Sequence, residues 1–568
     1  MKQAELQLNF ACGLLEQLKA LPREKKWVAS HLVSAFSRLA ISLRVKHATE
    51  KELMAAKSVL DKGYEIFSKY LPDSQYEERN AYYLAVDYSR FSEGFRKDNV
   101  RNVTMAKEAL EKTAALFKKW HGESGRIAGL GYNLMSDAIV LASDFRRQDT
   151  ALGLDAACGL MDSAFFIFKN RADKDNRVNR EAPYLMAGCL ALERALIEQR
   201  RPGLLTAAKE QLENAVFVFE KCRKTDAKVR GHVSFVIGGL LSSSAALRHR
   251  NDKGDMESAG KLQDKALDLF DEYHTQYEEA EELCAGVVTN SVSTVVELIK
   301  QDAPEGLKLA AEIFNKAYPI FEKYIGEYPE MDADGPRMLT NSLILVGRLL
   351  EYPDPDLVAL EKIMDGALGF FKRYRPLYPL ISEEAKFIVN NYSRIALQRL
   401  KQAPPDLDRA TVLMEKACSL YLEEPSAANS WGYVIAGYFG LYELVNDPDK
   451  IEEALEFFSR AALEREQEII GSTVAAFLCL KMGMTREAVS LADFVMRSIK
   501  NKALGFYKIA SEIKKTAEGQ SESPAQLAGG DSNTAVAINI VRRLTAAHRA
   551  AGPETALAPN PNPALRHI

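Results

Sequence analysis

Residues 106–117, AKEALEKTAALF, contain the pattern that decides the fold. Ala106 and Thr113 are small residues seven positions apart, and Phe117 follows the second of them by four positions. The same unit returns every 50 or 51 residues along the chain. Its aromatic residue falls at Phe67, Phe117, Phe168, Phe219, Phe270, Phe321, Phe371 and Tyr421. Repetition at a fixed period is typical of stacked repeats, in which each unit contacts only its neighbours.

Each unit is predicted to be a pair of helices. The small and aromatic positions share one face of a helix with a period of 3.6 residues, and small residues let a second helix approach closely. A second apolar column stands 17 positions after the aromatic one, within a stretch of about 20 residues that predicts the other helix. Its members are Leu84, Leu134, Leu185, Val236, Val287, Met338 and Ile388. Short turns rich in Pro, Gly and Asp join the helices, so we predict an all-α, right-handed α-solenoid of nine or ten antiparallel helix pairs.

The units near the C-terminus resemble the tetratricopeptide family. In residues 441–464, Ala454 and Ala461 stand at the family spacing with Phe458 between them, and Gly483 and Ala488 flank a turn of the family type. The period also shortens there, from 50 residues to about 44 and then to about 34, the family's usual length. Earlier units have longer helices than the family. The resemblance implies a tetratricopeptide-like solenoid with the first helix of each pair lining a concave groove.

Three regions are expected. Residues 1–47 depart from the pattern and predict an N-terminal capping helix pair, and residues 48–518 predict the solenoid. Residues 519–568 contain five prolines and no aromatic residue, and this composition predicts a disordered tail. Within the tail, residues 534–549 could form a short amphipathic helix. That helix is either transient or a motif that docks on a partner or in the protein's own groove.

Composition limits the classes of function. The 568 residues carry a net charge of -4, which gives no electrostatic reason to expect nucleic acid or an anionic membrane as a partner. No apolar run approaches 18 residues, so no membrane insertion is expected. The seven cysteines are scattered singly, as buried free thiols are in a reducing compartment, and a cytoplasmic protein is expected.

No motif of catalysis or cofactor binding occurs in the sequence, so we expect no enzyme, no cofactor and no metal site. Residues 330–341, EMDADGPRMLTN, imitate the start of a calcium-binding loop. However, Asn341 stands where a bidentate Glu is needed, and Arg337 occupies the usual apolar site. An acidic turn before a helix explains these residues better.

A polar or small column stands 20 positions after the aromatic residues. Its members are Asp87, Asp137, Gly188, Gly239, Asn290, Asn341 and Asn391. Equivalent positions on stacked helices form a ladder in space. Asn in a groove is able to hold the backbone of a bound chain through a donor and an acceptor, which makes Asp87, Asp137, Asn290, Asn341 and Asn391 candidate partner-binding residues. The alternative is that the column makes hydrogen bonds between helices inside the solenoid.

These observations predict a non-enzymatic scaffold or adaptor that binds a protein or peptide segment in the concave groove. The alternative function is a regulatory receptor whose solenoid binds a small molecule or a signalling peptide. Association of two copies through the terminal repeats is also open.

Overall fold

The computed structural model describes residues 2–19, 21–44, 49–96, 102–199, 202–250, 253–424, 426–427, 473, 476–477, 480, 485–498 and 505–519. Within these ranges the secondary structure is helical, with no strand. The chain divides into two compact units. Unit 1 comprises Met1–Arg250 and Asp268–Leu283, and unit 2 comprises Asn251–Leu267 and Cys284–Ile568. The predicted division into cap, solenoid and tail stays a prediction.

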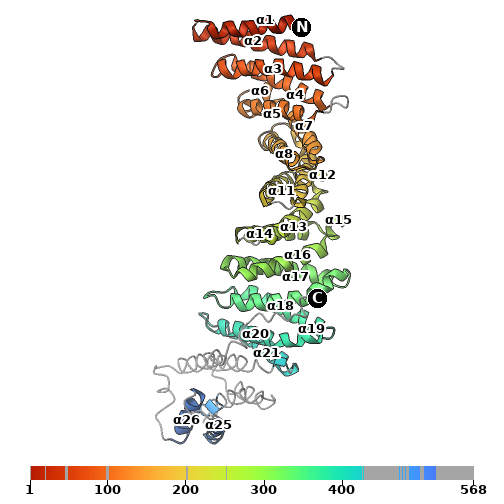
Figure 1. The fold of residues 1–568 in the computed structure, drawn as a ribbon. Helices are drawn as coiled ribbons and strands as arrows, with labels where there is room; N and C mark the ends of the chain where they lie inside the picture. Colours follow the sequence, from red (N-terminus) through yellow and green to blue (C-terminus); the bar gives the residue numbers. More distant parts are fainter. Residues whose placement is uncertain are drawn as a thin grey trace. The chain divides into compact units, whose positions relative to one another are not determined.

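Unit 1 consists of long helices joined by short connections, several of which form a single helical turn (Figure 1). The helices are α1 (Lys2–Gln17), α2 (Pro22–Leu43), α3 (Glu50–Tyr70), α4 (Glu77–Arg96), α5 (Val103–Trp120), α6 (Gly125–Ala128), α7 (Gly131–Arg146), α8 (Ala151–Arg171), α9 (Asn176–Arg180), α10 (Ala182–Glu198), α11 (Pro202–Cys222), α12 (Ala227–Arg230), α13 (Val233–Arg250) and α15 (Glu278–Glu281). The closest packing lies within the pairs α2–α3, α4–α5, α7–α8 and α10–α11. Each pair therefore has a first helix and a second helix, and the second helix carries the small and aromatic residues of the repeat.

Unit 2 continues the same arrangement after α14 (Lys253–Tyr273), which crosses the boundary between the units. Its other helices are α16 (Cys284–Gln301), α17 (Pro304–Tyr324), α18 (Pro329–Leu349), α19 (Leu357–Tyr374), the 3-10 helix η1 (Pro379–Glu384), α20 (Ala385–Leu400), α21 (Leu407–Glu423), α25 (Thr485–Ser498) and α26 (Gly505–Ala517). The pairs α16–α17, α18–α19, α20–α21 and α25–α26 pack most closely. The predicted all-α array of antiparallel helix pairs is confirmed for the described residues. The predicted tail, with its helix at 534–549, lies outside them from residue 520 onward.

The repeat columns form the core. All eight aromatic residues are buried, as are the small residues four and eleven positions before them, with Leu360 in place of one alanine. Close approach of helices is the reason for the small residues: a Cβ atom added at Gly63 of α3 would lie 3.1 Å from the Cβ of Phe36 on α2. Each second helix therefore packs its small face against the first helix of its pair.

Ion pairs repeat at the same register between successive second helices. An Asp six positions before the aromatic residue pairs with a Lys of the next unit, as Asp61 does with Lys112. Lys316 lies 2.7 Å from Asp264, and Lys416 lies 2.5 Å from Asp365. These pairs join one unit to the next at the edge of the core.

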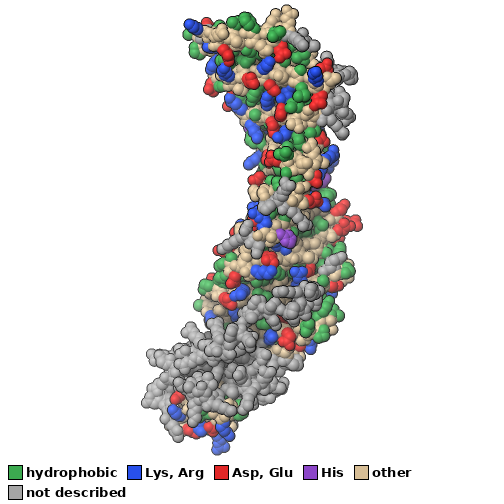
Figure 2. Space-filling model, in the orientation of Figure 1, with side chains coloured by type: hydrophobic (Ala, Val, Ile, Leu, Met, Phe, Trp, Pro, Cys, Tyr) green, Lys and Arg blue, Asp and Glu red, His purple; other side chains and the backbone are tan. Residues whose placement is uncertain are grey.

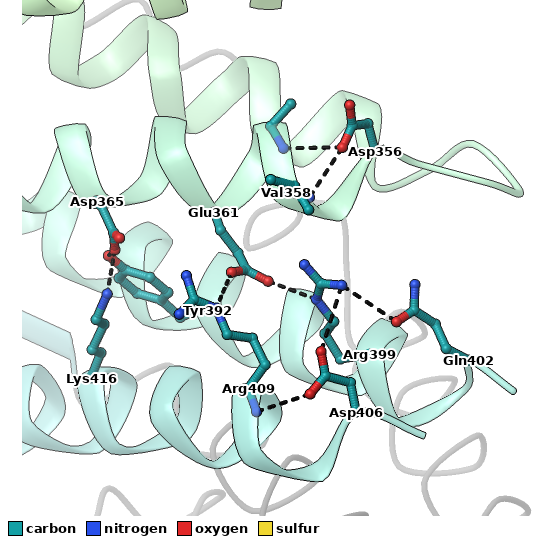
Figure 3. A network of polar contacts seen from close by, with 11 residues as sticks. Asp356, Val358, Glu361, Asp365, Tyr392, Arg399, Gln402, Asp406, Arg409 and Lys416 are labelled. Atoms are coloured by element: carbon teal, nitrogen blue, oxygen red, sulfur yellow. Dashed lines mark hydrogen bonds and ion pairs between the residues drawn. The ribbon is translucent and has the colours of Figure 1, made fainter. Parts of the chain in front are cut away.

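A larger polar network connects α19, α20 and α21 in unit 2 (Figure 3). Buried Glu361 accepts a hydrogen bond of 2.7 Å from Nε of Arg399 and one of 2.5 Å from Nε of Arg409. Arg399 also lies 3.8 Å from Asp406, the residue that caps α21. The carboxylate of Glu361 therefore holds two arginines from the two following helices, and its role is structural.

The N-terminal helix α1 leaves an apolar stripe uncovered. Leu6, Phe10 and Leu14 follow each other at one-turn spacing on α1 and are exposed, and Trp27 of α2 is also exposed. Helix α2 packs mainly against α3 and much less against α1. Association of two copies through this terminal repeat stays a prediction.

Two helical segments of the described chain have the length and composition of membrane spans, Ala151–Arg171 and Glu278–Gln301. In the apolar windows of these segments, 50% and 44% of the residues are buried inside the protein. Core helices of soluble proteins have the same length and apolar composition, so these two segments are weak evidence for a membrane span. The absence of membrane insertion stays a prediction.

Candidate functional site

The predicted polar column begins in unit 1 with two carboxylates that are bound within the protein. Asp87 of α4 is buried, and it accepts a hydrogen bond from Oγ of Ser37 on α2. Asp137 of α7 is half-buried and pairs with Arg96 at the end of α4. Burial raises the pKa of both carboxyl groups, and Arg96 opposes the rise at Asp137. Both residues therefore connect one first helix to the next.

The asparagines of the column lie in unit 2. The side-chain amide of Asn290 donates a hydrogen bond of 2.5 Å to Oε1 of Gln263 on α14, and that of Asn391 donates one of 3.0 Å to the backbone oxygen of Leu343 on α18. Both asparagines are buried. Asn341 is half-buried and lines a small hollow together with Ser291 and Met338.

Two positions of the column hold glycine, because a neighbouring side chain occupies the space that a Cβ atom would need. A Cβ at Gly188 would lie 2.9 Å from Cε of Met161, and one at Gly239 would lie 3.0 Å from Cδ2 of Leu190. As the residues stand in the structure, the column makes contacts between helices, which is the alternative left open by the sequence. Their use in binding a partner stays a prediction, and it would require those internal hydrogen bonds to break.

The exposed side of the first helices is rotated around the helix axis from the column. Positions 16, 19, 23 and 26 after the aromatic residue are exposed or half-exposed on α4, α7, α10 and α13 of unit 1. We call this stripe of unit 1 the first-helix face. Helices α7 and α10 contact each other directly, and so do α10 and α13, so the stripe continues from one helix to the next.

Large apolar side chains stand on this face without cover. At position 16 of the repeat, Tyr184 is 60% exposed and Phe235 is 65% exposed, and Tyr83 at the same position of α4 is 40% exposed. Val140, at position 23 of the repeat on α7, is 49% exposed. Tyr184 and Phe235 share position 16 on the neighbouring helices α10 and α13, while α7 carries Asn133 there. Exposed aromatic residues repeated in this way are typical of an interaction surface rather than of a solvated helix face.

The positions between the aromatic side chains are small. Position 19 holds Ala187 on α10 and Gly238 on α13, and position 23 holds Ala191 and Ser242. Small residues beside exposed rings leave room for the side chains of a bound chain. Asn133 and Ser136 of α7 lie on this same face and are exposed and half-exposed.

Basic residues border the aromatic row. The short helices α6, α9 and α12 that precede α7, α10 and α13 each place an exposed basic residue nine positions after the aromatic one: Arg126, Arg177 and Lys228. Arg180 follows at position 12 and is exposed, as is Arg79 at the same position of α4, whose guanidinium lies 5.8 Å from the centre of the Tyr83 ring. We call these five residues the basic rim.

The equivalent stripe of unit 2 differs. Position 16 holds Gly286, Arg337 and Phe387, of which Arg337 pairs with Asp334 at 3.2 Å and Phe387 is half-buried. The hollow lined by Asn341 has a volume of about 10 Å³, roughly the space that one water molecule needs. Cavities that hold small molecules usually measure roughly 300–1,000 Å³. Unit 2 therefore lacks the row of exposed aromatic residues among its described positions, and this hollow is small for a ligand.

The described residues offer no cluster of His, Cys, Asp or Glu that could hold a metal ion. The segment that imitates a calcium loop begins helix α18 instead, and Asp334 accepts a hydrogen bond of 2.5 Å from Oγ1 of Thr289. Position 335 of this helix holds glycine, because a Cβ atom there would overlap the ring of Tyr374. Residues 330–341 therefore lie inside this helix, rather than forming the predicted acidic turn before one.

One buried carboxyl group in unit 1 has a strongly shifted pKa. Glu193 of α10 accepts a hydrogen bond of 2.6 Å from Oγ of Ser243 on α13, and burial raises its pKa to about 7. It connects two first helices beneath the exposed stripe.

The aromatic row was visible in the sequence but was not recognised. Tyr184 and Phe235 stand one position before the apolar column at Leu185 and Val236. An aromatic residue next to a buried column is usually assigned to the core, because composition alone does not give the rotation of the helix. Its recurrence at position 16 in three of the first four units, Tyr83, Tyr184 and Phe235, was the available signal.

The sequence matches no family model and no curated protein. Among solved structures, a circular tandem repeat protein with novel repeat topology is 13% identical with a TM-score of 0.18, over 93% of this chain and 100% of that chain. SYS-1 is 11% identical with a TM-score of 0.26, over 92% and 100% of the two chains. Scc4, solved in complex with Scc2n, is 11% identical with a TM-score of 0.18, over 91% and 99%.

Similarity at this level carries no argument about function. The class of protein rests on the chain's own helices: it is an α-helical repeat protein, built as a solenoid of antiparallel helix pairs.

Proposed function

We propose that this protein is a non-enzymatic scaffold that binds a segment of another protein along the first-helix face of unit 1. The observation that carries the proposal is the exposed row of Tyr83, Tyr184 and Phe235. Covering one such side chain contributes roughly 1.5–3 kcal/mol, so a few of them are enough to retain a partner in spite of the entropy lost on binding.

The face is suited to an extended segment. Neighbouring first helices lie about 8–10 Å apart when packed, so the aromatic side chains recur at a spacing that several residues of an extended chain span. Because the rings are held by packed helices, little order has to be created on binding, which favours affinity. The partner-binding residues that support this proposal are Tyr184 and Phe235, with Tyr83 and Val140 beside them.

The proposal is tested by comparing what three forms of the full chain retain from a cell lysate, using quantitative mass spectrometry. The forms are the natural protein, the double variant Tyr184→Ala/Phe235→Ala, and a control, Met54→Ala/Leu152→Ala. Met54 and Leu152 are exposed apolar residues on the second helices α3 and α8 of the same unit. All four side chains are exposed, so none of the substitutions removes a residue of the core.

We expect at least one protein to be retained by the natural chain and by the control and to be lost, by about tenfold or more, from the Tyr184/Phe235 variant. Retention of the same proteins by all three forms would contradict the proposal. Recovery of a small molecule without any protein would instead favour the regulatory receptor.

A further inference from the structure

The charges around the first-helix face have one dominant sign. The basic rim contributes Arg79, Arg126, Arg180 and Lys228, together with Arg177, which pairs with Asp175. The stripe itself adds Arg90 on α4 and Arg194 on α10, which lie 3.9 Å from Asp87 and 3.1 Å from Glu198. Acidic residues near the aromatic row are fewer or are already paired. Glu93 is exposed, Asp137 pairs with Arg96, and Asp175 lies 3.0 Å from Arg177.

The basic rim ends where the next repeat begins. At the equivalent place, α15 carries Glu278, Glu279 and Glu281, followed by Glu282. These acidic side chains gather on the surface at α15 in Figure 2. The positive stretch thus coincides with the stretch of exposed aromatic residues, from α4 to α13, and stops with it.

From this coincidence we infer that the partner segment is acidic and carries apolar side chains among its Asp and Glu residues. This inference rests on the proposed function and specifies the chemistry of the ligand. The apolar side chains cover Tyr184 and Phe235 and lie over the small residues Ala187 and Gly238. The carboxylates meet the guanidinium and ammonium groups of the basic rim, which steers the segment to the face and fixes its position.

A nucleic acid fits the same observations less well. The whole chain has a net charge of -4, whereas a protein that binds nucleic acid through its phosphates usually carries a surplus of basic residues. The chain's own residues 534–549 fit less well too, because they carry Arg542, Arg543 and Arg549 and no acidic residue. That segment has the same sign of charge as the rim.

The test uses a library of random 12-residue peptides displayed on phage and selected against the full chain. Selection is repeated against Tyr184→Ala/Phe235→Ala, so that peptides depending on the aromatic row are identified. A second variant, Arg126→Glu/Arg180→Glu/Lys228→Glu, reverses three exposed charges of the rim. Its control, Lys51→Glu/Lys118→Glu/Lys169→Glu, makes the same change of net charge on exposed lysines of the second helices α3, α5 and α8.

We expect peptides that depend on the aromatic row to be enriched in Asp and Glu together with Leu, Phe or Trp. Reversal of the rim should lower their recovery by about tenfold at low salt, and the lysine control should leave it unchanged. Raising the salt concentration should weaken binding to the natural chain.

Three results would overturn the inference. The first is enrichment of neutral or basic peptides, and the second is unchanged recovery on the rim variant. The third is stronger competition by a 12-nucleotide single-stranded DNA or by the peptide of residues 534–549 than by the acidic peptides. Peptides that depend on Tyr184 and Phe235 but not on the rim would leave the proposed function standing while removing the acidic partner. If no peptide depends on the aromatic row, both fail.

Discussion

Glu193 shows how one buried carboxyl group connects pH to the stability of unit 1. Burial raises the pKa of Glu193 from 4.5 to about 7, against the hydrogen bond from Ser243 and the nearby charge of Arg194. The folded protein therefore binds this proton more tightly than the unfolded chain does. Its contribution to stability is complete below about pH 4.5 and is lost as the pH rises through about 7.

Glu193→Gln should remove this pH dependence, because the amide keeps a hydrogen-bonding group and never carries the charge. Between pH 5 and pH 8 the natural protein should lose up to about 3 kcal/mol of stability that the variant retains. The measurement is the melting temperature at several pH values. Glu198→Gln is the control, since the side chain of Glu198 is 64% exposed. Equal pH profiles for the natural protein and Glu193→Gln would contradict the assignment.

Gly335 tests the packing of α18 against α19. A Cβ at residue 335 would overlap the ring of Tyr374, a buried side chain, so Gly335→Ala should destabilise unit 2 by roughly 1–3 kcal/mol. Gly159→Ala on α8 is the control, because a Cβ there meets open space and alanine should stabilise the helix by about 0.5–1 kcal/mol. Thermal melts followed by circular dichroism distinguish the two. A stabilising effect at residue 335 would show that the helices are further apart.

At the scale of helices, the network around Glu361 should hold α19, α20 and α21 together (Figure 3). Glu361→Gln leaves Arg399, whose side chain is 11% exposed, with a weaker partner, and should cost about 3 kcal/mol. Hydrogen exchange in these three helices should become faster. Lys416→Gln, which breaks the more exposed pair with Asp365, should cost less than about 1 kcal/mol. Similar exchange in both variants would show that Glu361 contributes no more than a surface pair.

The helices themselves were predictable, and the rotation of the first helices was not. Phe117 and Ala106 are buried where the repeat placed them, because a second helix such as α5 has one apolar face and only one way to bury it. The first helix α10 is apolar on more than one side, since Tyr184 and Leu185 are neighbours. Only the packing of α10 against α7, α8 and α11 decides that Leu185 is buried and Tyr184 is exposed. The same rotation places Asn391 and Asp87 inside rather than in a groove.

At the scale of the whole molecule, the exposed stripe on α1 predicts association between copies. Leu6 and Phe10 are 68% and 70% exposed, and a second copy that covers them would bury both. Light scattering of the natural chain at increasing concentration should show a dimer, and Leu6→Glu/Phe10→Glu should remain a monomer. A monomer at all concentrations for both forms would show that this face does not drive self-association.

The first-helix face of unit 1 is proposed to contact a protein partner. A photo-crosslinking phenylalanine derivative placed at residue 235 reports that contact directly, and the same group at residue 152 on α8 is the matched control on the second-helix side. We predict that, in cell extract, residue 235 crosslinks to a segment of another protein and residue 152 does not. Crosslinks from residue 152 alone, or crosslinks from residue 235 only to this chain itself, would contradict it.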